Sequence, residues 1–71
     1  MWVVTASLNQ EIVGKPIEVR CVTPEQVIKT FELCGYEVDA YSSMPEWGRY
    51  FLHKWIDGLG MAEISIEEEE D

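Results

Sequence analysis

The sequence predicts an α/β (α+β) fold, a small two-layer sandwich in which two helices pack on one face of a four-stranded mixed sheet. Two observations carry this prediction. Four segments alternate apolar and polar residues, a pattern typical of half-buried strands. Two others repeat apolar residues at steps of three and four behind helix-capping sequences, which is typical of helices. The order of these elements along the chain is ββαβαβ.

Two strands begin the predicted sheet, at 2–8 and 17–22. The first alternates strictly, and its inward set is Trp2, Val4, Ala6 and Leu8. The second alternates in the same way, with the inward set Ile17, Val19 and Cys21. Turn-forming residues, among them Gly14 and Pro16, lie between these strands, so we expect 9–16 to form a hairpin-like connection.

The first helix is expected at 24–34. Thr23 and Gln26 have the spacing of a capping box, and Pro24 takes the first helical position, where its missing N–H costs nothing. Gly35 supplies the stop. The apolar face of this helix consists of Val27, Ile28, Phe31 and Cys34.

The second helix is expected at about 44–57. Ser43 and Glu46 form another capping-box pair, with Pro45 in the first turn. The apolar repeat consists of Trp47, Phe51, Leu52, Trp55, Ile56 and Leu59. A hairpin over 50–66 that turns at Asp57–Gly58 is the competing interpretation, because Asp-Gly is also a strong turn sequence.

The remaining strands are expected at 36–41 and 61–67. Their inward sets are Tyr36, Val38 and Ala40 in one, and Ala62, Ile64 and Ile66 in the other. Each strand–helix–strand step favours a parallel, right-handed crossover. Both helices would then lie on the same face of the sheet.

The chain has 71 residues, which predicts a single compact domain at 1–66 followed by an acidic tail at 67–71. Its formal net charge is −9, and removing the five tail acids leaves nine acids against five bases, a net of −4. Such a surface repels phosphates and anionic lipid, so we expect no direct binding to nucleic acid or membrane. We expect the tail to be dispensable for folding, because it contains no inward position of the last strand.

Few features of the sequence indicate an enzyme. His53, the only histidine, would stand one helical turn before Asp57, a spacing that more often gives an exposed pair than an acid–base site. Cys21 and Cys34 would both point inward, as core residues or, less commonly, as a disulfide or redox pair. No segment has the spacing of a zinc site, a calcium loop or a phosphate-binding loop. We therefore expect no enzyme, no cofactor and no metal.

The sequence also predicts a cytoplasmic protein. No stretch approaches the roughly 20 apolar residues that cross a bilayer. The N-terminal residues lack the basic and long apolar regions of a signal peptide. Two cysteines without metal-type spacing suit a reducing compartment.

Two surfaces are candidates for binding a partner. If both helices cover one face of the sheet, the opposite side displays five acids, one base and one aromatic residue: Glu18, Arg20, Glu37, Asp39, Tyr41, Glu63, Ser65 and Glu67. The second surface is the edge of the second helix, where Trp47, Arg49 and Tyr50 would protrude. Trp, Tyr and Arg are enriched in binding hot spots. A solvated face, and rings that wrap a small core, are the plainer interpretations.

These features favour a non-enzymatic acidic protein-binding module whose partner is a basic protein surface. Proteins that handle nucleic acid have Lys and Arg grooves, and spaced carboxylates can occupy such a groove as a phosphate or nucleic-acid mimic. In size and charge alone, the chain is similar to small acidic inhibitors made by bacterial viruses, anti-CRISPR proteins among them. Two alternatives stay open: a homo-oligomeric assembly subunit such as a homodimer, or a small-ligand-binding or enzymatic domain with its site between subunits.

Overall fold

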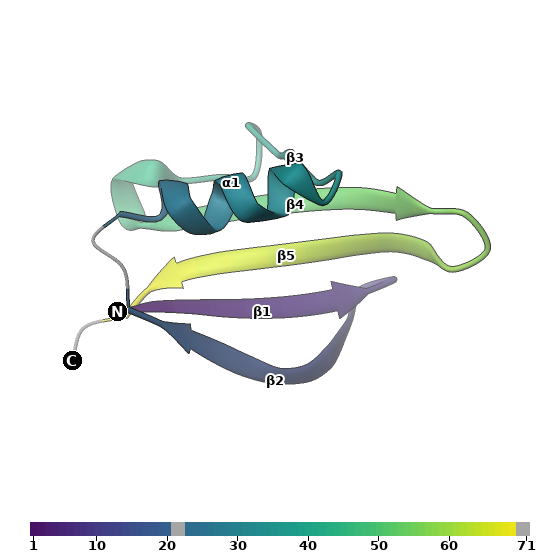
Figure 1. Cartoon of the computed structure of the whole chain (residues 1–71), viewed down its shortest axis with the longest axis horizontal. Helices are drawn as coiled ribbons and strands as arrows, with labels where there is room; N and C mark the ends of the chain where they lie inside the picture. The colour runs from purple at the N-terminus through teal and green to yellow at the C-terminus, as the bar shows by residue number, and fades with distance from the viewer. Residues whose placement is uncertain (21–22, 70–71) are drawn as a thin grey trace.

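A five-stranded sheet with one α-helix against it makes up the protein, seen in a computed structural model that describes residues 1–20 and 23–69 (Figure 1). The strand order is β2-β1-β5-β4-β3, and every neighbouring pair is antiparallel. The strands are β1 (Trp2–Leu8), β2 (Glu11–Val19), β3 (Glu37–Val38), β4 (Arg49–Ile56) and β5 (Gly60–Glu68). The helix is α1 (Glu25–Leu33), and a 3-10 turn, η1 (Pro45–Trp47), precedes β4.

The predicted four-stranded mixed sheet with two helices in ββαβαβ order is wrong. The two layers are present, but α1 is the single α-helix in the part of the chain that the structure describes. Segment 44–57 forms η1 and β4, so the competing interpretation, a hairpin that turns at Asp57–Gly58, is correct. The apolar spacing was misleading because β4 carries large side chains on both faces. Leu52 is buried on one face, while Phe51 and Trp55 alternate with it on the other.

The turn between β1 and β2 is shorter than the expected connection at 9–16. Asn9 and Gln10 alone make it, and both have a positive φ, as in the turns that suit two-residue hairpins. Gly14 and Pro16 belong instead to β2, where the register with β1 shifts between Val4 and Ala6. A bulge on an edge strand tolerates glycine and proline, so these residues bend the strand rather than end it.

The first helix is confirmed, although its N-terminal cap differs from the prediction. Pro24 is the N-cap residue, and no side chain caps the helix, so the Thr23–Gln26 capping box does not form. At the other end, the N–H of Gly35 donates to Glu32 O and the N–H of Tyr36 donates to Phe31 O, which is the Schellman arrangement. Cys34, predicted to point inward, is exposed because the helix has already ended there.

The lysine of β4 fastens the C-terminal end of α1 to the sheet. Lys54 Nζ donates to the Cys34 carbonyl oxygen at 2.7 Å and lies 5.8 Å from the centroid of the Tyr36 ring. A cation there complements the negative end of the helix dipole and the ring quadrupole. One side chain thus holds the helix end and the residue that follows it.

The strand predicted at 36–41 shrinks to the two residues of β3, because its continuation turns away from β4. The carboxylate of Asp39 accepts the N–H groups of Tyr41 and Ser42, which forms a local turn. Ser43 was expected to cap a helix, but its hydroxyl accepts the N–H of Phe51 at 3.0 Å. The hydroxyl therefore satisfies a β4 backbone group, and the Ser43–Glu46 capping box does not form.

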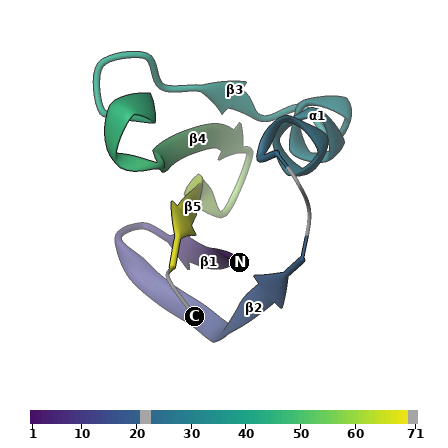
Figure 2. The same cartoon turned by 90° about the vertical axis from the view of Figure 1, so that its left-hand side faces the viewer.

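The core lies between α1 and the central strands. Its buried residues are Trp2, Val4, Leu52, Ile64 and Ile66, with Val27, Ile28 and Phe31 packed against them from the helix. The inward sets predicted for β5, and for the first half of β1, are confirmed. An end view shows the strands along an arc with α1 on its inner side (Figure 2). Ile17, predicted to point inward from β2, remains 63% exposed.

The last strand was predicted at 61–67, and it extends one residue further at each end. Glu67 and Glu68 pair with β1, and the Glu69 N–H donates to Met1 O at 2.9 Å. The acidic run is therefore part of the sheet up to this point. No helix in residues 1–20 and 23–69 is long and apolar enough to cross a membrane.

Candidate functional site

The face of the sheet opposite α1 is the main candidate surface, and we call it the open face. Strand alternation defines it, because Ala62, Ile64 and Ile66 of β5 are buried on the helix side. The intervening residues Glu63, Ser65 and Glu67 must then point the other way. Residues directly opposite these three on neighbouring strands share the open face.

One charged row crosses the open face near the chain termini. The register places Glu18 opposite Val3, Val3 opposite Glu67, and Glu67 opposite Arg49, across β2, β1, β5 and β4. Glu18 and Glu67 thus lie two strands apart, roughly 10 Å. The predicted acidic face therefore includes both residues, but Arg49, which was assigned to a helix edge, lies in the same row.

A second charged row crosses the open face further along the strands. Ser7 lies opposite Glu63, Glu63 opposite His53, and His53 opposite Glu37 of β3. His53 Nε2 stands 3.8 Å from a Glu37 carboxylate oxygen. The predicted helical pair of His53 and Asp57 does not form, because His53 lies in a strand. Residues four positions apart along a strand are separated by about 13 Å.

An aromatic side chain separates the two rows. Phe51 is half-buried and lies opposite Ser65, which in turn lies opposite Thr5. Two shallow depressions, of about 330 and 420 Å³, adjoin each other there, and Phe51 and Glu63 line both. The centre of the open face is thus apolar and small polar, with carboxylates around it.

Two predicted site residues lie beside the open face rather than on it. Asp39 borders the larger depression, and the Ser42 N–H that it accepts lowers its pKa, with help from the Ser42 hydroxyl, the Tyr41 N–H and the nearby His53. Its carboxylate is consequently ionised at neutral pH. Tyr41 is fully exposed in the same loop.

The second predicted surface does not exist as a single patch. Trp47 lies in η1 and is 75% exposed. Arg49 and Tyr50 are neighbours on β4, so their side chains point to opposite faces. Tyr50 packs on Trp2 on the helix side, with ring centroids 6.2 Å apart. These three residues were expected to protrude together only because the segment was expected to be helical.

The described residues do not assemble a metal-binding set. In residues 1–20 and 23–69, no three His, Cys, Asp or Glu side chains gather closely enough to hold a metal ion. Cys34 is exposed beside the end of α1, and Cys21 lies outside the described residues.

Sequence reasoning missed Phe51 and His53 as open-face residues. Both were placed on a helix, although the run from Arg49 to Ile56 is rich in aromatic residues that favour strands. Taken as a strand, that run alternates Arg49, Phe51, His53 and Trp55 on one side. The Asp57–Gly58 turn sequence pointed to the same arrangement.

Comparisons with protein-family models, with curated proteins and with solved structures found no match. The function must therefore be argued from the site itself.

Proposed function

We propose that the protein is a non-catalytic binding module that uses the open face to hold a basic partner protein. The observation that carries this proposal is the arrangement of Glu18, Glu37, Glu63 and Glu67 around Phe51 on a sheet face that α1 leaves uncovered. An apolar centre with a charged rim is the usual anatomy of a protein–protein interface.

Charge explains why the partner should be basic. The whole chain carries a formal net charge of −9, so approach of a basic surface is accelerated at long range. At short range, Phe51 supplies apolar contact, which charged residues at the rim do not. The two effects are separable, because salt screens the first and leaves the second.

The mixed charge of the two rows refines the expected partner. Arg49 and His53 interrupt the carboxylates, each directly opposite one of them. A continuous row of phosphates has no such interruptions. The pattern therefore favours a basic protein surface with some acids of its own over an unbroken Lys and Arg groove.

The size of the open face favours a complex that forms and dissociates readily. Strands of seven to nine residues extend roughly 25–30 Å, and four strand spacings cover about 19 Å. The resulting area of roughly 500 Å² is below the ~800 Å² that each partner contributes to a standard interface.

The test isolates a partner first and then locates its binding surface with charge-matched variants. Proteins captured on the immobilised chain are purified and titrated against the wild type, Glu63→Gln/Glu67→Gln, and Glu25→Gln/Glu32→Gln. Both variants lose two charges, but only the first loses them from the open face; the second loses them from α1. We expect the open-face variant to bind about three- to tenfold more weakly, mainly through a slower association rate.

A Phe51→Ala variant tests the apolar centre. We expect a loss of about tenfold or more in affinity that persists at high salt. Equal weakening by both charge-matched variants, together with no effect of Phe51→Ala, would remove the open face as the binding surface. If duplex DNA competes completely with the chain for the captured protein, the partner is instead a protein with a nucleic-acid-binding groove.

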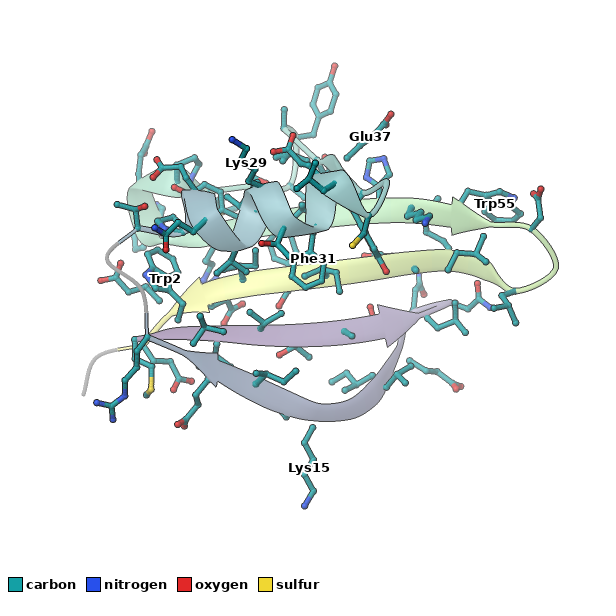
Figure 3. All side chains as sticks on the ribbon, in the orientation of Figure 1. Trp2, Lys15, Lys29, Phe31, Glu37 and Trp55 are labelled. Carbon is teal, nitrogen blue, oxygen red and sulfur yellow. The ribbon has the colours of Figure 1, made fainter. Side chains whose placement is uncertain are left out.

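A second candidate function is self-assembly through β2. This strand forms one edge of the sheet, and Ile12, Val13 and Ile17 on it are 70%, 55% and 63% exposed. Ile17 also lines an apolar groove of about 410 Å³ between β2 and α1. Exposed edge strands are templates for pairing with another chain, although Lys15 and Pro16 at the bulge oppose it. The Lys15 side chain points away from the sheet at this edge (Figure 3).

Sedimentation distinguishes this candidate. Self-association through β2 predicts a concentration-dependent dimer that Ile17→Lys abolishes. Leu33→Lys is the matched control, because Leu33 is 82% exposed but belongs to α1 and not to the edge strand β2. A monomer at all concentrations excludes the assembly function.

A further inference from the structure

We propose that a pocket at the terminal end of the sheet binds the cationic head group of an arginine or lysine side chain from a partner protein. This proposal rests on the basic partner of the proposed function, and it adds a contact beside the open face, because Trp2 and Tyr50 pack on the helix side of the sheet. We call the site the aromatic–acidic pocket. Its lining includes Trp2, Glu46, Trp47, Gly48, Tyr50 and Glu68, around a volume of about 450 Å³.

Four segments that are distant in sequence meet at this pocket. Trp2 comes from β1, Pro24 from the start of α1, residues 45–50 from η1 and β4, and Glu68 from the end of β5. Their convergence depends on the tertiary fold alone. The pocket lies at the end of the sheet where Trp2 is found, and Trp55 marks the opposite end (Figure 3).

The walls of the pocket are held in place by contacts within the fold. Trp2 is only 6% exposed, and its ring is tilted by 54° against that of Tyr50. The Glu68 N–H donates to Gly48 O at 2.9 Å, and the Gly48 N–H donates to Pro45 O at 3.1 Å. A Cβ at Gly48 would come within 2.9 Å of the Glu68 Cβ, so glycine allows this close approach.

The two carboxylates of the pocket form no ion pair within 4 Å with any Lys, Arg or His side chain. All Lys, Arg and His side chains lie in residues 1–20 and 23–69, and the one ion pair within 4 Å among them joins His53 and Glu37. Glu46 and Glu68 therefore line the pocket without a basic side chain within 4 Å. Trp47, 75% exposed, adds a large aromatic surface beside them.

This combination matches the chemistry of a cation bound on aromatic rings. Ring faces attract cations electrostatically, and carboxylates add charge-assisted hydrogen bonds. A guanidinium group stacks on rings, is weakly hydrated and donates to carboxylates in pairs, whereas an ammonium does none of these as well. Arginine should consequently bind more tightly than lysine, and an uncharged side chain of similar length should not bind.

The experiment titrates the full chain, labelled with ¹⁵N, with three probes: N-acetyl-arginine amide, N-acetyl-lysine amide and N-acetyl-norleucine amide. The readout is the shift of the tryptophan indole N–H signals, assigned by single Trp→Phe variants. We expect the Trp2 and Trp47 signals to move saturably with arginine, at a dissociation constant of about 1–10 mM. The Trp55 signal, from the opposite end of the molecule, should stay in place.

Variants then assign the contribution of each kind of side chain. We expect Trp47→Ala and Glu68→Gln each to weaken arginine binding by about two- to fivefold. Glu32→Gln, which removes an exposed acid from α1 outside both the pocket and the open face, is the matched control and should leave arginine binding unchanged. The backbone amide spectrum of each variant verifies that the fold is retained. Shifts of equal size with norleucine, or no saturable shift with arginine, would overturn the proposal.

The outcomes for the pocket and for the open face are distinguishable. If arginine amide fails to bind while Glu63→Gln/Glu67→Gln still weakens a purified partner, the pocket proposal fails and the proposed function stands. If arginine amide binds but the open-face variant has no effect on a partner, the pocket stands and the open face does not. The pocket is tested by the tryptophan indole signals of the labelled chain. The open face is tested by the affinity of a purified partner.

Discussion

Asp39 anchors the loop that follows β3. Its carboxylate accepts the N–H groups of Ser42 and Tyr41, and these hydrogen bonds, led by that of Ser42, lower its pKa below the ordinary value. A group whose pKa is lower in the folded state stabilises the fold above its ordinary pKa of about 3.9 and loses that contribution as the pH falls through the lower folded value. The charge on this loop is therefore part of its structure.

The corresponding prediction concerns pH. Asp39→Asn keeps an acceptor oxygen but loses the charge, so we expect a small loss of stability against urea at pH 7. The difference from the wild type should shrink as the pH falls below about 4. Glu32→Gln on α1 is the control for a lost surface acid. A wild-type-to-Asn difference that is the same at pH 7 and pH 2 would contradict the assignment.

Phe51 illustrates the other lesson at this scale. Residue type alone could not distinguish a core aromatic from an exposed one, because the answer depends on which face of β4 the helix covers. Glu18, Glu37, Glu63 and Glu67, in contrast, were expected on the uncovered side from alternation within their own strands, and the register places them there. The local sequence shows which residues of a strand share a face. Which of the two faces the helix covers depends on the tertiary fold.

At the scale of elements, the two hairpin turns contact each other. Asn9, in the β1–β2 turn, donates from Nδ2 to Leu59 O at 2.8 Å and accepts the Met61 N–H on Oδ1 at 3.0 Å. Gly60 has a φ of 118°, and a Cβ there would collide with the Asn9 carboxamide. One side chain therefore ties the end of the first hairpin to the end of the second.

We expect Gly60→Ala to destabilise the protein by about 1–3 kcal/mol, through backbone strain and displacement of Asn9. Gly58→Ala is the matched control, since Gly58 also has a positive φ but no atom lies within 4 Å of its added Cβ. Thermal or urea unfolding measures both. If Gly58→Ala costs as much as Gly60→Ala, the turn-to-turn contact contributes nothing.

Elements with strong local sequence patterns were predicted well. Helix α1, strand β1 and strand β5 each follow from periodicity and end residues, and the structure has them within a few positions. Strand β4 was assigned to a helix because it carries large apolar side chains on both faces. Only the tertiary arrangement decides which of these side chains are buried and which are exposed. The same error dispersed the binding residues: Arg49 and His53 belong beside Glu67 and Glu63.

At the scale of the whole molecule, the acidic run is tied into the sheet. Glu67 and Glu68 pair with β1, the Glu68 N–H reaches Gly48 O, and the Glu69 N–H reaches Met1 O. Each such hydrogen bond contributes about 0.5–1.5 kcal/mol net. Repulsion between neighbouring carboxylates acts in the opposite direction and weakens with salt.

Deleting 67–71 should therefore destabilise the protein, by about 1–3 kcal/mol in urea unfolding, contrary to the expectation from sequence. The control replaces all the acids of 67–71 by Gln or Asn, which keeps the backbone hydrogen bonds and removes the charge. We expect this variant to be as stable as the wild type or more so. Equal losses in both variants would mean that the charge, and not the strand, matters.

The centre of the sheet has a consequence for how the chain acquires its fold. Strands β1 and β5 lie side by side, yet their paired residues are 54 to 66 positions apart, from Leu8 with Ala62 to Trp2 with Glu68. Pairing between such distant segments closes a long loop, which slows folding, whereas the two hairpins form locally. During synthesis, the edge of β1 that pairs with β5 in the folded sheet therefore stays unpaired until β5 has left the ribosome.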